Sequence, residues 1–160
     1  MAELKYKDYI FTEFKEDSNL PAVLSPQAYL RGARQIPGAN ANFGFQVFVK
    51  PIFLEKEPHI HDNDEYLIFL GAEPPDVFGS FDAEIDFWMG EEQEYYLIDK
   101  ATIIFIPAGM PHTPLDFRKL NKPVLFTALL LSPKFEKTMN GVRFEYDGPG
   151  YGGAPKTIDI

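Results

Sequence analysis

The feature that most restricts the fold of this chain is a series of short apolar segments that begins at Phe43. Six segments follow one another, each rich in β-branched or aromatic residues: FGFQVFVKPIFLE, YLIFLG, AEIDFWMG, EYYLID, TIIFIP and VLFTALLL. Gly, Pro, Asp or Asn residues separate them, which is typical of turns between strands. Since no helical period stands between the segments, the sequence predicts an antiparallel β-sandwich or barrel.

The chain has 160 residues, which fits one domain with a sizeable core. Its 15 Phe and 8 Tyr residues predict an interior lined with bulky aromatic side chains. We divide the sequence into an N-terminal arm (residues 1–42), a β-barrel (residues 43–132) and a C-terminal tail (residues 133–160). We expect the tail to pack on the barrel or on a partner subunit.

One short helix is predicted within the N-terminal arm. Ser25 is a suitable N-cap, Pro26 suits the first helical position, and the helix would end before Pro37. Further along, the Pro- and Gly-rich stretch over residues 71–83 predicts a long loop between two strands.

Charge and composition argue against several classes of partner. The formal net charge is −9, and no run of Lys or Arg could neutralise a line of phosphates, so we expect no nucleic-acid partner. The longest apolar runs are much shorter than the ~20 residues of a membrane span, so we expect no membrane partner. The sequence contains no Cys and begins without a secretory pattern, which favours a cytoplasmic location.

The three histidines of the chain fall in two short motifs. On a strand, His59 and His61 would lie on one face, with Cα atoms roughly 6.5 to 7 Å apart. The turn-forming residues 62–64 let the chain reverse, which brings Glu65 back beside His61. His112 follows the rigid stretch PAGMP and could point at the same interior site from a neighbouring strand.

Three neutral imidazoles and one carboxylate form a ligand set that suits a divalent transition metal. Fe, Mn, Ni, Co, Cu and Zn are all compatible with it, whereas Ca and Mg fit poorly. We therefore predict a metal site made of His59, His61, Glu65 and His112. The alternative is that each histidine is an unrelated polar residue of the core or surface, which becomes less plausible when all three take part.

These two motifs resemble the signatures of the cupin superfamily. HIHDNDE and IPAGMPH match its two histidine motifs at every metal-ligand position. Four other positions depart from the pattern: Phe53 and Ala101 replace glycines, Gly71 arrives one residue early, and Asp116 replaces a closing Asn. The resemblance implies a small jelly-roll barrel, a double-stranded β-helix, that binds the metal inside and usually forms homodimers.

The segment AEIDFWMG offers candidate catalytic groups. Strand alternation places Glu84, Asp86 and Trp88 on one face, which is either solvent or the barrel interior. If that face is internal, burial would raise the pKa of Glu84 or Asp86 and let one of them act as a general base. Lys50 and Arg118 are candidates to bind a substrate carboxylate or phosphate.

We therefore expect a metal-dependent enzyme that acts on a small oxygenated molecule, such as a hydroxy acid, sugar acid or phenolic compound. Lewis-acid lyase or isomerase chemistry and dioxygenation all fit the same ligand set. The alternative is a cupin module that binds a small ligand or metal without turnover. Large apolar rings outside the barrel favour packing of the arms on their own barrel or on a second subunit: Tyr6, Tyr9, Phe11, Phe14, Phe135 and Phe144.

Overall fold

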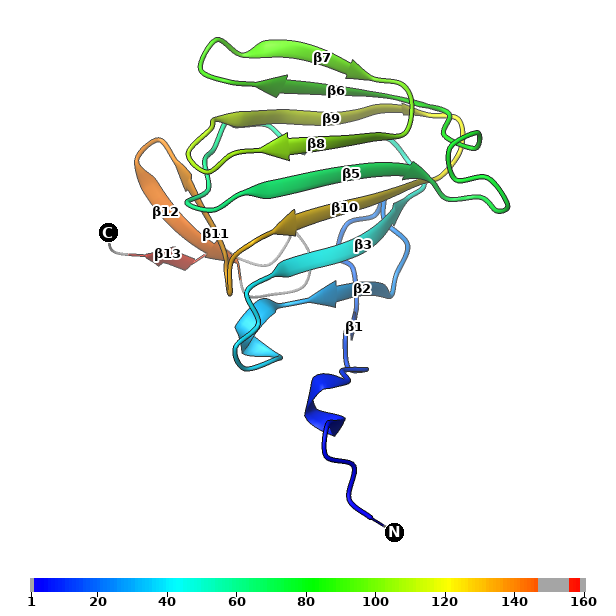
Figure 1. Ribbon diagram of the computed structural model, residues 1–160. Coiled ribbons are helices and arrows are strands. Elements are labelled where there is room, and N and C mark those ends of the chain that lie inside the picture. The colour runs from blue at the N-terminus through cyan, green and yellow to red at the C-terminus, as the bar shows by residue number, and fades with distance from the viewer. Residues whose placement is uncertain (1, 147–155, 159–160) are drawn as a thin grey trace.

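The structure is a computed structural model of the chain and describes residues 2–146 and 156–158 (Figure 1). Thirteen strands and two 3₁₀ turns make up these residues. The N-terminal elements are η1 (Lys7–Tyr9), β1 (Lys15–Glu16), β2 (Gln27–Leu30) and η2 (Gly32–Arg34). The central strands are β3 (Asn42–Phe48), β4 (Ile52–Glu55), β5 (Glu65–Gly71), β6 (Ala83–Met89), β7 (Glu94–Ile98), β8 (Thr102–Ile106), β9 (His112–Leu120) and β10 (Val124–Leu130). The C-terminal strands are β11 (Phe135–Met139), β12 (Val142–Tyr146) and β13 (Lys156–Ile158).

Two antiparallel sheets face each other across one core (Figure 1). The larger sheet has the order β1-β2-β3-β10-β5-β8, and the smaller has the order β4-β9-β6-β7. Neighbours in these sheets are often distant in sequence, as where β10 lies between β3 and β5. The expected antiparallel all-β architecture is confirmed.

Aromatic side chains fill the space between the sheets. The rings of Phe48 and Phe117 stack with centroids 4.1 Å apart, and Phe126 meets Phe48 edge-on at 5.7 Å. Phe69 completes the group, with its centroid 5.0 Å from that of Phe126. All four side chains are fully buried. Offset and edge-to-face pairs of this kind add to the stabilisation from area burial, so the predicted aromatic interior is confirmed.

The predicted helix over residues 26–36 is wrong. Gln27 to Leu30 form β2, which alternates buried and half-buried side chains and pairs with β3. The capping signals at Ser25 and Pro26 are therefore overridden by hydrogen bonding to a sheet edge, a tertiary effect that local propensity does not contain. Only Gly32–Arg34 turn helically, and Gly32 takes a positive φ of 55° where a Cβ would collide with the Pro133 carbonyl.

Segments at both ends of the chain complete the fold. Strands β1 and β2 extend the larger sheet, while β11, β12 and β13 form a separate three-stranded sheet. Residues 147–155 and 159–160 of the expected tail lie outside the described residues. The expected long loop does connect β5 to β6. Within the described residues, no helix is long and apolar enough to span a membrane.

Candidate metal centre

The chain before Glu65 is extended and passes directly over the start of β9. Isolated bridges join His59 to His112 and Ile60 to Thr138, with the His59 amide donating to the His112 carbonyl at 3.1 Å. The chain then turns over residues 62–64, and β5 begins at Glu65, as the turn-forming sequence predicts. Both predicted local features of this motif are confirmed.

A tight turn holds His112 against the first motif. Gly109 takes a positive φ of 81° and donates its backbone N–H to the carbonyl of His61 at 2.8 Å. The Ala108 N–H donates to a carboxylate oxygen of Asp64 at 2.9 Å. Glycine adopts this backbone conformation at low cost. The PAGMP stretch is thus fastened to the loop that carries His59 and His61.

The three histidines and Glu65 meet in one buried cluster. Ligand atoms of His59, His61 and His112 all lie within 4.8 Å of one another. Glu65 reaches two of the rings: its Oε2 is 3.3 Å from Nε2 of His61, and its Oε1 is 3.2 Å from Nε2 of His112. Each of the four residues is at most 5% exposed. The structure therefore brings together all four residues that the sequence nominated.

Hydrogen bonds at the far side of each ring determine which nitrogen carries the proton. Nδ1 of His61 lies 2.5 Å from the Glu136 carbonyl, and Nδ1 of His112 lies 3.0 Å from the Met110 carbonyl. A carbonyl only accepts, so Nδ1 of each ring donates and Nε2 of the neutral ring keeps its lone pair. These contacts orient both rings with Nε2 toward Glu65.

Thr113 plays the same part for His59. Its hydroxyl donates to the Glu57 carbonyl at 2.7 Å, which leaves the oxygen free to accept from Nδ1 of His59 at 3.1 Å. A hydroxyl can donate once and accept at the same time. His59 is therefore held in the same tautomer as the other two rings, with its Nε2 lone pair available.

Burial sets the protonation states of the cluster. It lowers the pKa of His59 well below its usual value, and the neighbouring His112 and His61 lower it further. Burial also lowers the pKa of His61, an effect that Glu65 opposes. Burial would raise the pKa of Glu65, but His61 and His112 outweigh it, so that pKa is lowered. Neutral imidazoles facing an ionised carboxylate are the forms that bind a metal cation.

The buried cluster leaves two ring nitrogens unused. Nε2 of His61 and Nε2 of His112 are buried and have no hydrogen-bond partner within the described residues. Both nitrogens lie about 3 Å from carboxylate oxygens of Glu65, and two acceptors this close repel each other unless a proton or a metal cation lies between them. A divalent transition metal fits this donor set.

The likeness of this chain to known proteins comes from solved structures. The sequence matches no protein-family model and no curated protein. Bacillus subtilis oxalate decarboxylase is similar with 14% identity and a TM-score of 0.50, over 79% of this chain and 30% of that one. A Klebsiella pneumoniae protein with a double-stranded beta-helix domain shows 11% identity and a TM-score of 0.48, over 87% and 97% of the two chains. Hydroxypropylphosphonic acid epoxidase from S. wedmorenis shows 13% identity and a TM-score of 0.47, over 72% and 55%.

The strand order and the likeness to the oxalate decarboxylase agree on the architecture. The fold is a double-stranded β-helix. Cupin proteins such as this decarboxylase are its structural neighbours. This chain spans about 30% of the length of the oxalate decarboxylase, and identities this low concern the fold alone.

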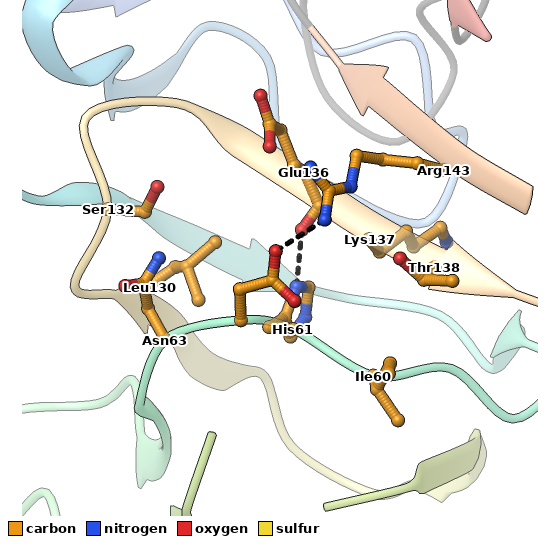
Figure 2. A pocket seen from close by; sticks show the side chains of 10 residues that line it. Ile60, His61, Asn63, Leu130, Ser132, Glu136, Lys137, Thr138 and Arg143 are labelled. Atoms are coloured by element: carbon orange, nitrogen blue, oxygen red, sulfur yellow. Dashed lines mark hydrogen bonds and ion pairs between the residues drawn. The ribbon is translucent and has the colours of Figure 1, made fainter. Parts of the chain in front are cut away.

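Strand β11 closes the double-stranded β-helix over the histidines, a contact that sequence reasoning missed. Figure 2 shows Glu136, Lys137 and Thr138 on β11 beside His61 and Ile60. Phe135 packs its ring edge-on against His61, with centroids 5.5 Å apart. In the FEKTM segment the buried positions are Phe135 and Lys137, so its sequence shows no apolar alternation. Nothing in the segment itself could show that this strand crosses the other motif.

A buried ion pair next to the cluster was also missed. Nζ of Lys137 lies 3.1 Å from both carboxylate oxygens of Glu55, and the two side chains are only 4% and 11% exposed. Burial raises the pKa of Glu55, which Lys137 partly offsets. Glu55 ends β4 and Lys137 lies in the middle of β11, and charged residues on strands are usually solvated.

The nominated catalytic carboxylates lie on the other side of their strand. Ile85 and Phe87 of β6 are buried in the core, so Glu84 and Asp86 belong to the outer face of the double-stranded β-helix. Arg118 donates to Asp86 at 2.7 Å and to Glu84 at 2.9 Å. Arg118 lowers the pKa of Asp86, opposite to the rise expected for an internal carboxyl. The general-base role itself is untested and stays a prediction.

Proposed function

We propose that this chain is a metal-dependent enzyme that acts on a small oxygenated organic molecule. The observation that carries the proposal is the convergence of two buried, unpartnered imidazole nitrogens on an ionised carboxylate. His59, His61, Glu65 and His112 would hold the ion, which could be Fe, Mn, Ni, Co, Cu or Zn. A related fold supports the assignment, since the Bacillus subtilis oxalate decarboxylase has Mn(II) centres.

A metal bound here would act as a Lewis acid toward oxygen atoms of the substrate. The protein's own residues prepare the site. Each histidine ring is held in orientation by an oxygen atom of Glu136, Met110 or Thr113. The rings therefore need little reorganisation when they bind a metal. Strand β11 and the core exclude bulk water, which strengthens every electrostatic interaction inside.

The substrate would be a hydroxy acid, sugar acid or phenolic compound, and lyase, isomerase and dioxygenase chemistry all remain candidates. Glu84 or Asp86 as general base would require a substrate that reaches the outer face. The alternative function is a binding module without turnover. A cytoplasmic location also stays a prediction.

Elemental analysis of the purified protein tests the metal centre. We expect close to one transition metal per chain, and none in the double variant His59→Ala/His61→Ala. Asp86→Asn is the matched control, because it alters a polar side chain on the outer face of β6 that pairs with Arg118, and it should keep the metal. Metal retained in the double variant would overturn the ligand assignment. Oxygen uptake with catechols and diketones would then separate dioxygenation from lyase or isomerase chemistry.

We also propose a homodimer formed through the outer face of the larger sheet. That face carries apolar side chains on every central strand. The N-terminal arm extends away from the sheets (Figure 1). Eight large apolar side chains of the arm and face are 43–83% exposed: Leu4, Tyr6, Tyr9, Ile10, Phe14, Phe45, Ile103 and Phe105. Large side chains carry about 150–250 Å² each, so these expose on the order of 900 Å². A standard interface buries about 800 Å² per partner, which a second copy would supply.

Sedimentation velocity over a dilution series tests this dimer. The wild-type mass should be twice the chain mass of 18.2 kDa. Ile103→Glu with Phe105→Glu should produce monomers, whereas Phe53→Glu, an exposed Phe of the other sheet, should not. A monomeric wild type would refute the dimer, and vesicle binding by that monomer would instead assign the face to a membrane.

A further inference from the structure

The Glu55 and Lys137 pair lies within electrostatic reach of the metal cluster. Glu55 ends β4 and Lys137 lies in the middle of β11, so two strands from different parts of the chain deliver the charges to one place. The Lys137 ammonium contributes to lowering the pKa of His59, His61 and Glu65. The pair therefore shares the enclosed region with the proposed metal ligands.

The Lys137 ammonium is buried but not saturated by Glu55. It has three N–H donors, and its contacts to the two Glu55 oxygens use at most two of them. Its other close contact is the ring of Tyr146, whose centroid lies 4.8 Å away. A ring face attracts a cation but accepts no strong hydrogen bond. Among the residues that the structure describes, nothing else accepts a hydrogen bond from Lys137, so one donor remains for an oxygen atom of a bound molecule.

The charges of the enclosed region favour an anion. A divalent ion and Lys137 together bring three positive charges, while Glu55 and Glu65 bring two negative ones. The loaded region would carry one net positive charge in a buried setting, where an uncompensated charge is costly. A molecule with a single negative charge would neutralise it, whereas a neutral molecule would not.

A small cavity lies beside this region, between the His61 loop and β11. It has a volume of about 40 Å³ and is lined by His61 and Lys137, with Asp62 and Arg143 paired at 2.7 Å on its wall. Figure 2 shows this cavity between the His61 loop and β11. A cavity of this volume can hold a molecule of a few heavy atoms when its lining side chains move slightly.

We propose that Lys137 binds the carboxylate of a small monoanionic substrate beside the metal, with Glu55 as its resting counter-ion. This inference rests on the proposed metal-dependent function and narrows its substrate to monoanionic acids, such as 2-hydroxy acids. Lys137 is a specificity-determining residue in this proposal. The competing interpretation is that the pair only fastens β11 to β4.

Calorimetric titration of the metal-loaded protein with glycolate and glycolamide tests the proposal. Both probes offer a hydroxyl and a carbonyl-type oxygen, but only glycolate carries a charge. Lys137→Met should weaken glycolate binding about tenfold or more relative to glycolamide, because a charge-assisted hydrogen bond is lost. Glu55→Gln should strengthen glycolate binding, because a negative charge is removed. Lys137→Arg should keep the preference for glycolate.

Lys134→Met is the matched control, since Lys134 is 59% exposed and lies just before the same strand. It should change neither affinity. If Lys137→Met does not fold, the double variant Glu55→Gln/Lys137→Met keeps the net charge of the region but removes the hydrogen-bond donor, and it should weaken glycolate binding about tenfold relative to glycolamide. A wild type without preference for glycolate, or a preference that survives in Lys137→Met, would overturn the inference. Metal content measured first separates this failure from a failure of the metal centre itself.

Discussion

The chain contains two carboxylate–cation pairs that look alike in sequence but lie in different surroundings. Glu55 and Lys137 are enclosed beneath β11, with both side chains nearly inaccessible. Asp86 and Arg118 lie on the outer face of the smaller sheet, where the Arg118 side chain is 45% exposed. The first pair shares its enclosure with the histidine cluster, while the second borders solvent.

The pKa values of Glu55 and Asp86 shift in opposite directions. Burial raises the pKa of Glu55 despite the adjacent ammonium. The hydrogen bond from Arg118 lowers the pKa of Asp86, and a second hydrogen bond from Tyr95 adds to this, so that together they outweigh the desolvation of the carboxylate. The pKa of a carboxylate in an ion pair can thus be raised or lowered, depending on whether desolvation or hydrogen bonding has the larger effect.

The largest expected difference is in stability. Lys137→Met leaves the Glu55 carboxylate buried and unpaired, which costs about 3–5 kcal/mol. For a chain of this size, the melting temperature would fall by about 10 °C. Arg118→Met should have a much smaller effect, since Asp86 also accepts a hydrogen bond from Tyr95 at 2.6 Å. Thermal denaturation of both variants checks this. Equal losses would mean that the two pairs are not distinguished by burial.

Metal removal should affect only the interior region. An ion at 100 times its dissociation constant stabilises the folded state by about 2.7 kcal/mol. A chelator should therefore lower the melting temperature of the metal-loaded protein by about 5–10 °C. His61→Ala should show no such decrease, whereas Asp86→Asn should behave like the wild type. A decrease that persists in His61→Ala would place the stabilising ion elsewhere.

The sequence predicted the parts of this molecule that depend on local spacing. Strand alternation and turn residues were enough to place His59, His61 and Glu65 together, because that motif needs only one turn to form. His112 joins them through a bridge between distant segments, which spacing alone only allowed. The same alternation correctly separated Asp86 from Phe87 across the strand. The face that each would occupy stayed open, since alternation gives two faces without saying which one is internal.

The missed features all depend on contacts between distant segments. Lys137 meets Glu55 across 82 positions of the chain, and the Glu136 carbonyl meets His61 across 75. No periodicity within one segment contains such a pairing. The wrong helix at Gln27–Leu30 has the same origin, since that strand exists through its pairing with β3. The histidine motifs therefore predicted the residues of the cluster but not the groups that enclose it.

The pH dependence of stability should have opposite signs for the two carboxylates. The pKa of Glu55 is raised in the folded state, so its contribution is complete below pH 4.5 and is lost as the pH rises through the folded-state pKa. The pKa of Asp86 is lowered, so its contribution is complete above pH 3.8 and is lost as the pH falls through the folded-state value.

Thermal denaturation of the metal-free protein across this pH range measures both effects. The stability of the wild type relative to Glu55→Gln should decrease with rising pH. Its stability relative to Asp86→Asn should increase as the pH rises through the acidic window. Slopes of the same sign would contradict the assignment of one pair to the interior and the other to the outer face.

The smallest expected effect is the change in catalytic rate when Glu84 or Asp86 on the outer face is replaced. A general base contributes about 10²–10⁴-fold to a rate. Because Glu84 and Asp86 are both bound by Arg118 on the face away from the core, we expect Glu84→Gln and Asp86→Asn to change the rate far less than this. The rate with any substrate found for the metal-loaded protein is the measurement, with Lys134→Met as a surface control. A loss in the general-base range in either variant would show that substrate reaches the outer face, and the division of chemistry between the two pairs would then have to be reversed.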